Sequence, residues 1–584
     1  MGSGGVGFGE PLGGLCFSVR YPDPTAQTSC DRGVRSLRRI AGSSANTPDA
    51  DLTLHGLARL VAEFLNRLDL AELIPDARLV EIDDSYIGVE SVPVQVIALV
   101  KHDCETCATL APALEKAAAA GAPVRIVSQS PEAETRAFAE RVGLATVPEL
   151  DDDLALSERL DPEAVPAVVL LDGDTERDRV EGLHRSRLEA LFEAAGATLP
   201  RDGLPEIKPG CASITQEPEV AARIAARRAR AEGRIRAREL DLGALEDPFE
   251  ALHDRGLTDG LPVVPPTPER VVAMLEHTAR DSQDVVGVVP PYGGEATVEK
   301  VAINAVMAGC AGPELPIVLA AVQAACREEF ALHGLIATTH PAGPVVVVSG
   351  PYAQEAGMNS GGNALGQGTR ANSTIGRALQ LVARNIGGGR PGVEDRATHG
   401  SPGKVGAAFA ERLDDSPFDG LAQDRGVPTD ETGVTVVAAE APRLLLDQLA
   451  REPEGLCASL ATALESIAHP KQRLAWDGMV VLGPEHGRIF REAGWDRARV
   501  RDELFARTTS PAGEIVRGAG GSPEGVEARF VTDPDMPVAK FAAPDRILVA
   551  YAGGDAGLFS MVYGTWAAGE IGSAPQSVSV EPWR

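Results

Sequence analysis

Short apolar runs alternate with longer helical stretches over most of this chain. In the helical stretches apolar residues recur every three or four positions, and we predict helices over residues 52–73, 298–307 and 315–326. The short runs are rich in β-branched residues, and we predict strands over residues 285–290, 344–349, 434–438, 479–482 and 546–550. Strands that alternate with helices are typical of α/β domains, so an α/β fold is expected.

The chain has 584 residues, which is more than one hydrophobic core normally supports, so several domains are expected. Residues 1–48 are rich in Gly, Ser and Arg without a sustained period, which predicts a disordered leader. Residues 49–198 predict a first folded domain that opens with a helix. Residues 199–246 predict a linker that leads into a charged, solvated helix over 217–240. Residues 247–584 predict a larger α/β domain, built as one unit or as two halves.

A pair of cysteines follows a hydrophobic run within residues 92–112. Cys104 and Cys107 stand where that run ends and a helix is expected to begin. At a helix N-terminus the unpaired N–H groups and the helix dipole favour a thiolate on the first sulfur, which we expect to be exposed. The second sulfur lies one turn further on and can resolve a mixed disulfide. The spacing predicts a redox pair, with a metal site that includes His102 and an inert dithiol or disulfide as the alternatives.

The segment from about residue 91 to residue 196 resembles the thioredoxin superfamily in more than this pair. The other matching features are Pro112 five residues after the second cysteine, Val165-Pro166 with the apolar run 167–171, which resembles the cis-proline strand that faces the pair, and a closing strand and helix over 178–182 and 186–195. The resemblance implies a thioredoxin-like domain in which Cys104, Cys107 and Pro166 form a redox-active centre. It also implies thiol–disulfide oxidoreductase activity and a Cys104–Cys107 disulfide in the oxidised state.

The dipeptide between the cysteines departs from the family pattern. Glu105-Thr106 replaces Gly-Pro, and no Trp precedes the pair. A carboxylate beside the first cysteine opposes its thiolate, so Glu105 is expected to raise the pKa of Cys104 relative to a neutral dipeptide. We therefore expect a dedicated partner in place of a general disulfide reductase.

Two further cysteines stand in positions that suit chemistry. Cys211 follows Lys208-Pro-Gly in the expected linker, where a tight, exposed turn would present a reactive thiol. Cys310 stands at the turn between two predicted helices and would serve as a second redox or nucleophilic thiol. The alternatives are an ordinary loop cysteine for Cys211 and a buried small apolar residue for Cys310.

Polar side chains of the C-terminal region concentrate between residues 340 and 404. His340 and His399 are candidates for general acid–base roles, together with Lys404. A glycine-rich loop there precedes a helix that Asn372 or Ser373 is expected to cap and that runs to Asn385, which would form an anion-binding helix N-terminus. The candidate substrate-binding residues are Asn359, Ser360, Asn363, Arg370, Arg377 and Lys404. The loop lacks the Gly-Lys-Ser/Thr of a P-loop and the third glycine of a dinucleotide fingerprint, and a purely structural connection is the alternative.

The C-terminal region also resembles an uncharacterised bacterial family over most of its length. The strings that carry the resemblance are residues 292–298, 302–310, 359–363 and 397–400. Members of that family occur as fusions or neighbours of thioredoxin-like proteins and of small proteins with Cys- or selenocysteine-Gly-Ser-Cys motifs. The association implies thiol or selenol chemistry and names no substrate.

The charge balance excludes several function classes. A net charge of -29 argues against nucleic-acid and anionic-membrane binding, because both need clustered positive potential. The sequence has no run of about 18 apolar residues, so no membrane span is expected. Eight cysteines over this length are too sparse for a secreted disulfide scaffold, and a cytoplasmic enzyme is expected. We expect no metal and no cofactor beyond the redox-active dithiol, and a homo-oligomer.

Three functions remain open at this point. In the first, the Cys104–Cys107 dithiol passes electrons to a small-molecule substrate in the C-terminal domain, with a thiol reductase or a low-molecular-weight thiol as a further partner. In the second, the chain is a non-redox lyase or hydrolase that acts on an anionic small molecule, and the thioredoxin-like domain is a docking module. In the third hypothesis, the chain is a redox-sensing binding protein without turnover.

Overall fold

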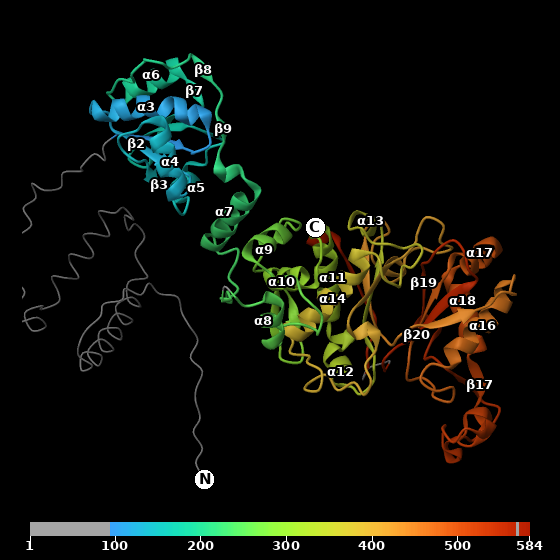
Figure 1. Cartoon of the computed structure of the whole chain (residues 1–584). Helices are drawn as coiled ribbons and strands as arrows, with labels where there is room; N and C mark the ends of the chain where they lie inside the picture. Colours follow the sequence, from blue (N-terminus) through green and yellow to red (C-terminus); the bar gives the residue numbers. More distant parts are fainter. Residues whose placement is uncertain (1–93, 244, 568–571) are drawn as a thin grey trace, which may run out of the picture. The chain divides into compact units, whose positions relative to one another are not determined.

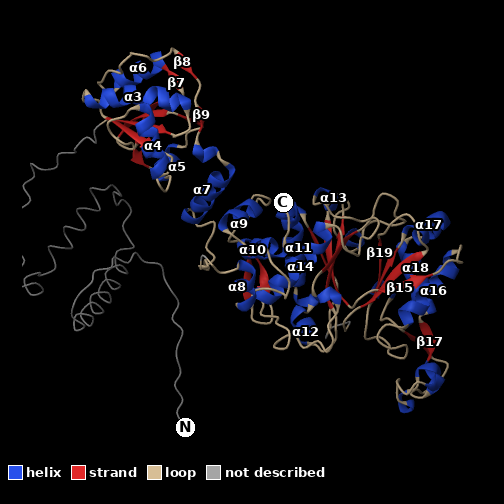
Figure 2. Ribbon diagram, viewed as in Figure 1, coloured by secondary structure: helices blue, strands red, loops and turns tan. Residues whose placement is uncertain are grey.

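The computed structural model describes residues 94–243, 245–567 and 572–584 (Figure 1). The expected leader over 1–48 and the expected helix over 52–73 lie outside these residues. Helices and strands alternate through the described chain, which confirms the α/β class (Figure 2). Among the described residues, no helix is both long enough and apolar enough to cross a bilayer.

The first described body is built on a five-stranded sheet in the order β3-β2-β1-β5-β6. Strand β1 pairs parallel with β2 and antiparallel with β5, and β5 pairs antiparallel with β6. The elements are β1 (Gln95–Val100), α3 (Glu105–Ala119), β2 (Val124–Ser128), α4 (Glu132–Val142), β3 (Glu149–Leu150), α5 (Ala155–Leu160), β4 (Ala164–Val165), β5 (Ala167–Asp172), β6 (Thr175–Glu181), β7 (Leu183–His184), α6 (Arg185–Ala194), β8 (Ile207–Lys208) and β9 (Cys211–Ala212). The strand, cis-proline and closing-helix features expected from the thioredoxin resemblance are all present.

The central strand β1 is apolar on both sides because helices cover both faces of the sheet. Val96 and Ala98 pack with α3 and α6 in a cluster that includes Phe192, which is fully buried. Ile97 and Leu99 point the other way, into a cluster with Phe138 of α4. A strand that alternates its side chains between two covered faces reads as a continuous apolar run, which is why β1 was recognisable in the sequence.

Residues 207–212, which we call the strap, belong to this body and not to a linker. Strand β8 pairs with β7, and β9 pairs with β4, with Val165 opposite Cys211. The expected linker over 199–246 is corrected to this extent. The charged helix is also shorter than expected, since α7 spans Pro218–Ala231 and buries Val220 and Ile224 on one face.

The C-terminal region holds two four-stranded sheets. Its elements are α8 (Pro248–Asp254), α9 (Pro268–Leu275), β10 (Val285–Val289), β11 (Gly294–Thr297), α10 (Val298–Ala308), α11 (Leu315–Ala325), α12 (Leu332–Ala337), β12 (Gly343–Ser349), α13 (Tyr352–Glu355), α14 (Arg370–Asn385), β13 (Ala407–Ala410), α15 (Leu421–Asp424), β14 (Gly433–Ala439), β15 (Arg443–Leu446), α16 (Pro453–Glu465), β16 (Gly478–Leu482), α17 (Pro484–Ala493), α18 (Arg497–Arg507), β17 (Thr509–Pro511), β18 (Pro537–Ala539), β19 (Ile547–Tyr551), β20 (Phe559–Gly564) and β21 (Gln576–Ser579). The predicted strands and the helices predicted over 298–307 and 315–326 are confirmed to within a few residues.

The two sheets repeat one topology. In the order β13-β12-β14-β21, β12 is parallel to β13 and antiparallel to β14; in the order β19-β16-β20-β15, β16 is parallel to β19 and antiparallel to β20. The fourth strands are exchanged, because β15 follows β14 in sequence but joins the second sheet, while β21 follows β20 and joins the first. The two expected halves correspond to the two sheets. Each sheet takes its fourth strand from the chain segment that follows the other sheet.

The two sheets face each other through a shared apolar layer. Val345 and Val347 of β12 contact this layer from one side, and Met479 and Val481 of β16 contact it from the other. On the outer faces, α10, α11 and α14 cover the first sheet, and α16, α17 and α18 cover the second. The C-terminal domain is therefore a four-layered helix–sheet–sheet–helix sandwich.

Candidate redox site

The predicted cysteine pair lies at the N-terminus of α3, where β1 has just ended. Cys104 is the N-cap residue, and its Sγ accepts a hydrogen bond from the backbone N–H of Cys107 at 3.3 Å. The Cys107 Sγ in turn accepts from the backbone N–H of Lys101 at 3.4 Å. A cysteine that caps a helix faces the free N–H groups of the first turn, which stabilise a negative sulfur.

Pro166 follows a cis peptide bond from Val165, as the thioredoxin resemblance implies. Strand β5 begins directly after it and pairs with β1. The start of β5 therefore lies beside the end of β1. Cys104 Sγ lies 3.3 Å from the carbonyl oxygen of Val165, to which the protonated form of the thiol donates. The predicted residues Cys104, Cys107 and Pro166 are thus brought together.

The two thiols have opposite pKa shifts. A hydrogen bond from the Cys107 thiol is the main reason that the pKa of Cys104 falls to about 5, against the opposing effect of burial. Hydrogen bonds from the thiol and backbone N–H of Cys211 lower the pKa of Cys104 further. Burial raises the pKa of the Cys107 thiol well above its usual value. At neutral pH Cys104 is therefore the thiolate, and Cys107 is the thiol that donates to it.

Glu105 does not counteract this thiolate as strongly as the sequence suggested. Its side chain is 91% exposed, and its carboxylate lies 3.8 Å from Lys208 Nζ. A solvated, partly neutralised carboxylate has little effect on a neighbouring buried sulfur. The net pKa shift of Cys104 is downward.

The expectation that the first sulfur is exposed is wrong. Cys104 is 1% exposed and Cys107 is 0% exposed. The strap covers them: Thr106 Oγ1 donates to the carbonyl oxygen of Pro209 at 2.6 Å, and Lys208 Nζ donates to that of Glu105 at 3.3 Å. These contacts join residues about a hundred positions apart, so no local sequence pattern predicts them.

In the alternative of a metal site, His102 would be a ligand together with the two cysteines. Its Nδ1 lies 3.0 Å from Ser130 Oγ, and its backbone N–H donates to the same oxygen at 3.0 Å. Within residues 94–243, 245–567 and 572–584 no group of three or more His, Cys, Asp or Glu side chains is arranged to hold a metal ion.

The predicted acid–base residues of the C-terminal domain lie near one another. The Thr398 N–H donates to the Thr339 carbonyl at 2.9 Å, which brings the His340 and His399 segments side by side. His340 is half-buried and stacks on Trp476 with ring centroids 5.3 Å apart, and burial lowers its pKa. His399 is exposed. Lys404 is paired with Asp395 at 2.7 Å.

The glycine-rich loop is held largely by its own polar groups. Asn359 Nδ2 donates to the Gly362 carbonyl at 2.8 Å, and the Ser360 carbonyl accepts from the Gly553 N–H at 2.9 Å. Asn363 has a positive φ of 62° and lines a cavity of ≈ 460 Å³ at the second sheet. The loop therefore borders a cavity through Asn363, while Asn359 and Ser360 shape the backbone.

The arginines expected to bind an anion already have partners. Arg370 Nε and Nη2 donate to the carbonyls of Gly309 and Cys310 at 2.7 and 2.9 Å. Arg377 forms a two-point ion pair with Asp259, with both N···O distances at 2.8 Å. Helix α14 starts at Arg370 with Thr369 as its N-cap residue, which corrects the expected cap at Asn372 or Ser373.

Cys310 lies apart from the redox pair in sequence and in a different core. It is 5% exposed, and burial together with the neighbouring Glu314 raises its pKa well above the usual value. Cys211, in contrast, is brought to the pair by β9 and packs against the same apolar cluster. Desolvation and the Cys104 sulfur raise the pKa of the Cys211 thiol.

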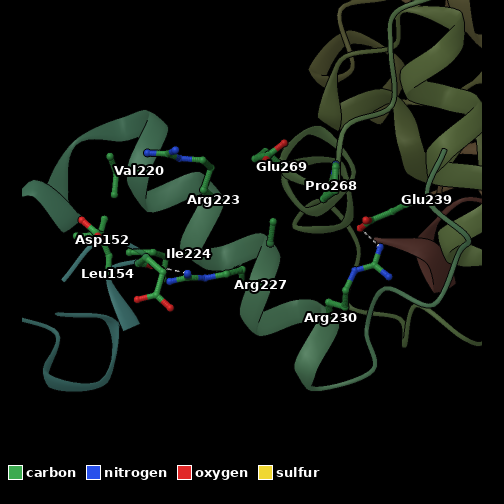
Figure 3. A pocket seen from close by; sticks show the side chains of 12 residues that line it. Asp152, Leu154, Val220, Arg223, Ile224, Arg227, Arg230, Glu239, Pro268 and Glu269 are labelled. Atoms are coloured by element: carbon green, nitrogen blue, oxygen red, sulfur yellow. Dashed lines mark hydrogen bonds and ion pairs between the residues drawn. The ribbon is translucent and has the colours of Figure 1, made fainter. Parts of the chain in front are cut away.

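A further pocket of ≈ 390 Å³ lies along α7 (Figure 3). Three arginines of this helix, Arg223, Arg227 and Arg230, line it. Arg227 is paired with Glu158 and Arg230 with Glu239, so the acidic neighbours offset most of its positive charge. The sequence predicted a charged, solvated helix here, and its ion pairs agree with that prediction.

Comparisons with known proteins find structural likeness only. No protein family model matches the chain, and no curated protein matches it. A secreted Mycobacterium tuberculosis disulfide oxidoreductase, homologous to E. coli DsbE, is 21% identical over 18% of this chain and 81% of its own, with a TM-score of 0.16. A putative thioredoxin from Neisseria meningitidis is 17% identical over 18% and 75% (TM-score 0.16), and StoA from Bacillus subtilis is 16% identical over 18% and 84% (TM-score 0.16).

Proposed function

We propose that this protein is a thiol–disulfide oxidoreductase whose redox group is the Cys104–Cys107 dithiol. The observation that carries the proposal is the hydrogen bonding of Cys104, a helix-capping sulfur with a pKa of about 5 beside a Cys107 thiol that donates to it. A thiolate with a resolving thiol one helical turn away is the arrangement that disulfide exchange requires.

The geometry supports a two-step exchange. The Cys104 thiolate attacks one sulfur of a substrate disulfide, a mixed disulfide forms, and the first substrate sulfur leaves as a thiolate. The Cys107 thiol then loses its proton and attacks Cys104 Sγ, which releases the second substrate sulfur and leaves a Cys104–Cys107 disulfide. Two electrons pass to the substrate, and its two thiolates take up two protons, one from Cys107 and one from solvent.

The acceptor proposed for these electrons is a small molecule held by the C-terminal domain. Covalent linkage supports this, because a tether raises the effective concentration of a donor at its acceptor. The C-terminal domain offers a half-buried His340, the Lys404–Asp395 pair and the cavity beside Asn363. A thiol reductase or a low-molecular-weight thiol would return the dithiol to its reduced state.

The proposal is tested by disulfide reduction with the full chain. A low-molecular-weight disulfide such as oxidised glutathione is offered to the reduced protein, and the released thiol is measured. Cys104→Ser is expected to abolish the reaction, while Cys457→Ser, a change in a buried cysteine of the second sheet's core, should leave it intact. Equal rates for the wild type and Cys104→Ser would refute the proposal.

The same variants separate the non-redox alternative. A lyase or hydrolase that uses His340 and Lys404 would lose turnover in His340→Ala and keep it in Cys104→Ser. The half-buried, stacked position of His340, with its lowered pKa, keeps a neutral imidazole available for such chemistry.

A further inference from the structure

A third cysteine, Cys211, belongs to the same sulfur cluster as Cys104 and Cys107. It stands opposite Val165 in the β4–β9 pair, and the Val165 carbonyl oxygen lies 3.3 Å from Cys104 Sγ. Its side chain packs against the apolar cluster that contains both members of the pair. Its thiol and its backbone N–H lie near enough to Cys104 to lower the pKa of that sulfur.

The position of Cys211 is fixed by close backbone packing on both sides. A Cβ atom on Gly210 would lie 2.9 Å from the Val165 carbonyl oxygen, and one on Gly182 would lie 2.8 Å from the Gly210 nitrogen. The hydrogen bond from Thr106 to Pro209 holds the strap to the first turn of α3. The close packing at Gly182 and Gly210 and the hydrogen bond from Thr106 to Pro209 therefore hold the backbone of Cys211 against the pair.

The three sulfurs differ in their access to solvent. Cys104 and Cys107 are 1% and 0% exposed, whereas Cys211 is partly exposed at the edge of the strap. A small molecule that approaches the centre in this conformation meets Cys211 first.

We propose that Cys211 is a third redox-active cysteine of this centre, which takes Cys104 as its disulfide partner in exchange with Cys107. The inference rests on the proposed function, since the exchange starts from a Cys104–Cys107 disulfide. The Cys211 thiolate attacks Cys104 Sγ, the Cys104–Cys107 bond breaks, and Cys107 leaves as a thiolate that takes up a proton. One S–S bond forms and one breaks, so the step needs no outside oxidant.

The start of α3 assists the attacking sulfur. The backbone N–H groups of Thr106 and Glu105 lower the pKa of the Cys211 thiol, against the larger opposing effect of desolvation. In the reduced protein the neighbouring Cys104 thiolate opposes a negative charge on Cys211, but the Cys104–Cys107 disulfide removes that thiolate. Oxidation of the pair therefore removes the contribution of Cys104 to the raised pKa of Cys211, while the contribution of desolvation remains.

The exchange gives small thiols a route to the buried pair. A low-molecular-weight thiolate attacks Cys211 Sγ of the Cys104–Cys211 disulfide, forms a mixed disulfide on Cys211 and releases the Cys104 thiolate. A second thiol molecule attacks that mixed disulfide, frees Cys211 and leaves as the external disulfide. Two external thiols are oxidised and one protein disulfide is reduced, so the electrons balance.

The test is disulfide mapping of the full-length Cys107→Ser variant after mild oxidation with diamide. Trypsin separates residues 102–116, which then contain only Cys104, from residues 202–223, which contain Cys211. A cross-link between these two peptides is expected, and it should be absent from the Cys104→Ser variant. Two free thiols in oxidised Cys107→Ser, under conditions that form the Cys104–Cys107 disulfide in the wild type, would overturn the inference and leave the proposed function standing.

A second measurement does not depend on the folding of Cys107→Ser. Wild-type and Cys211→Ser proteins are oxidised, and their reduction by glutathione is followed by alkylation and mass spectrometry, with Cys457→Ser as the matched control. Loss of the exposed sulfur is expected to slow reduction on the order of tenfold, because the remaining disulfide is buried. Equal rates of reduction in the wild type and Cys211→Ser would contradict the role of Cys211. Failure of the wild type to form any Cys104–Cys107 disulfide would contradict both this inference and the proposed function.

Discussion

Val165 and Cys211 face each other across the β4–β9 pair, and this pairing closes the redox centre. Val165 precedes the cis-proline, and its carbonyl oxygen lies 3.3 Å from Cys104 Sγ, while Cys211 comes from the chain that leaves the domain. The strap thus acts as a fourth wall of the site, beside β1, α3 and β5. It explains why two cysteines at a helix N-terminus are buried in this protein.

Gly210→Ala is expected to lift the strap from the pair. A Cβ there would meet the Val165 carbonyl oxygen at 2.9 Å and Ala164 Cβ at 3.0 Å, and the backbone on both sides leaves no room. We expect destabilisation of about 1–3 kcal/mol by urea unfolding and faster alkylation of Cys104. Gly455→Ala, where the nearest atom lies 3.8 Å away, is the matched control: it should leave the alkylation rate unchanged and, as a Gly→Ala change inside helix α16, stabilise the protein by about 0.5–1 kcal/mol. Unchanged alkylation in Gly210→Ala would show that the strap does not cover the sulfur in solution.

The ionisation of Cys104 predicts a specific pH dependence. Its folded pKa of about 5 lies below the usual thiol value, so the thiolate is present at neutral pH and is lost as the pH falls through about 5. Thiolate absorbance near 240 nm should therefore show a midpoint close to pH 5 that is missing in Cys104→Ser. Cys107→Ala removes the largest hydrogen bond to the thiolate and should move the midpoint upward, while Cys326→Ala should not. A midpoint near 8 or 9 in the wild type would be incompatible with this electrostatic account.

Thr106→Val tests the hydrogen bond that fastens the strap. Its Oγ1 donates to the Pro209 carbonyl at 2.6 Å, and valine keeps the shape of the side chain without the donor. The expected loss in the free energy of unfolding is about 0.5–1.5 kcal/mol, with a rise in the alkylation rate of Cys211. Thr462→Val, whose hydroxyl bonds only within its own exposed helix turn, is the control for the change in helix propensity. If Cys211 were alkylated at the same rate in Thr106→Val as in the wild type, the bond from Thr106 to Pro209 would not be what holds the strap in place.

The exchanged edge strands predict that the last residues of the chain stabilise the first sheet. Trp583 is 5% exposed in the core of the first sheet, and its Nε1 donates to Gln323 of α11 at 3.1 Å. Trp583→Ala is expected to cost about 3–5 kcal/mol in urea unfolding of the C-terminal domain. Trp476→Ala, at a half-buried position, is expected to cost less. If Trp583→Ala were as mild as Trp476→Ala, the terminal segment would not be part of that core.

Local patterns predicted much of the redox domain. The apolar run of β1, the Cys104 and Cys107 spacing and the Val165-Pro166 dipeptide are each readable within a few residues, because strand burial, helix capping and the cis-proline strand leave local signatures. The alternation of strands and helices likewise predicted both sheets of the C-terminal domain.

Contacts between distant segments could not be predicted in this way. Cys211 looked like a loop cysteine because its pairing with Val165 depends on the register of a two-residue strand that starts 46 positions after Val165. Arg377 looked free to bind an anion because its partner Asp259 stands 118 residues earlier. The exchange of β15 and β21 is a property of strand order, which single segments do not specify.

The central claim is that Cys104 and Cys107 form a reversible redox couple. Full-length protein is equilibrated in glutathione buffers of graded potential, alkylated, and read by mass spectrometry of residues 102–116. We predict a two-electron transition at a potential less negative than the roughly −270 mV of thioredoxin, because the low pKa of Cys104 stabilises the reduced form. A pair that stays fully reduced, or fully oxidised, across the whole range would contradict the account.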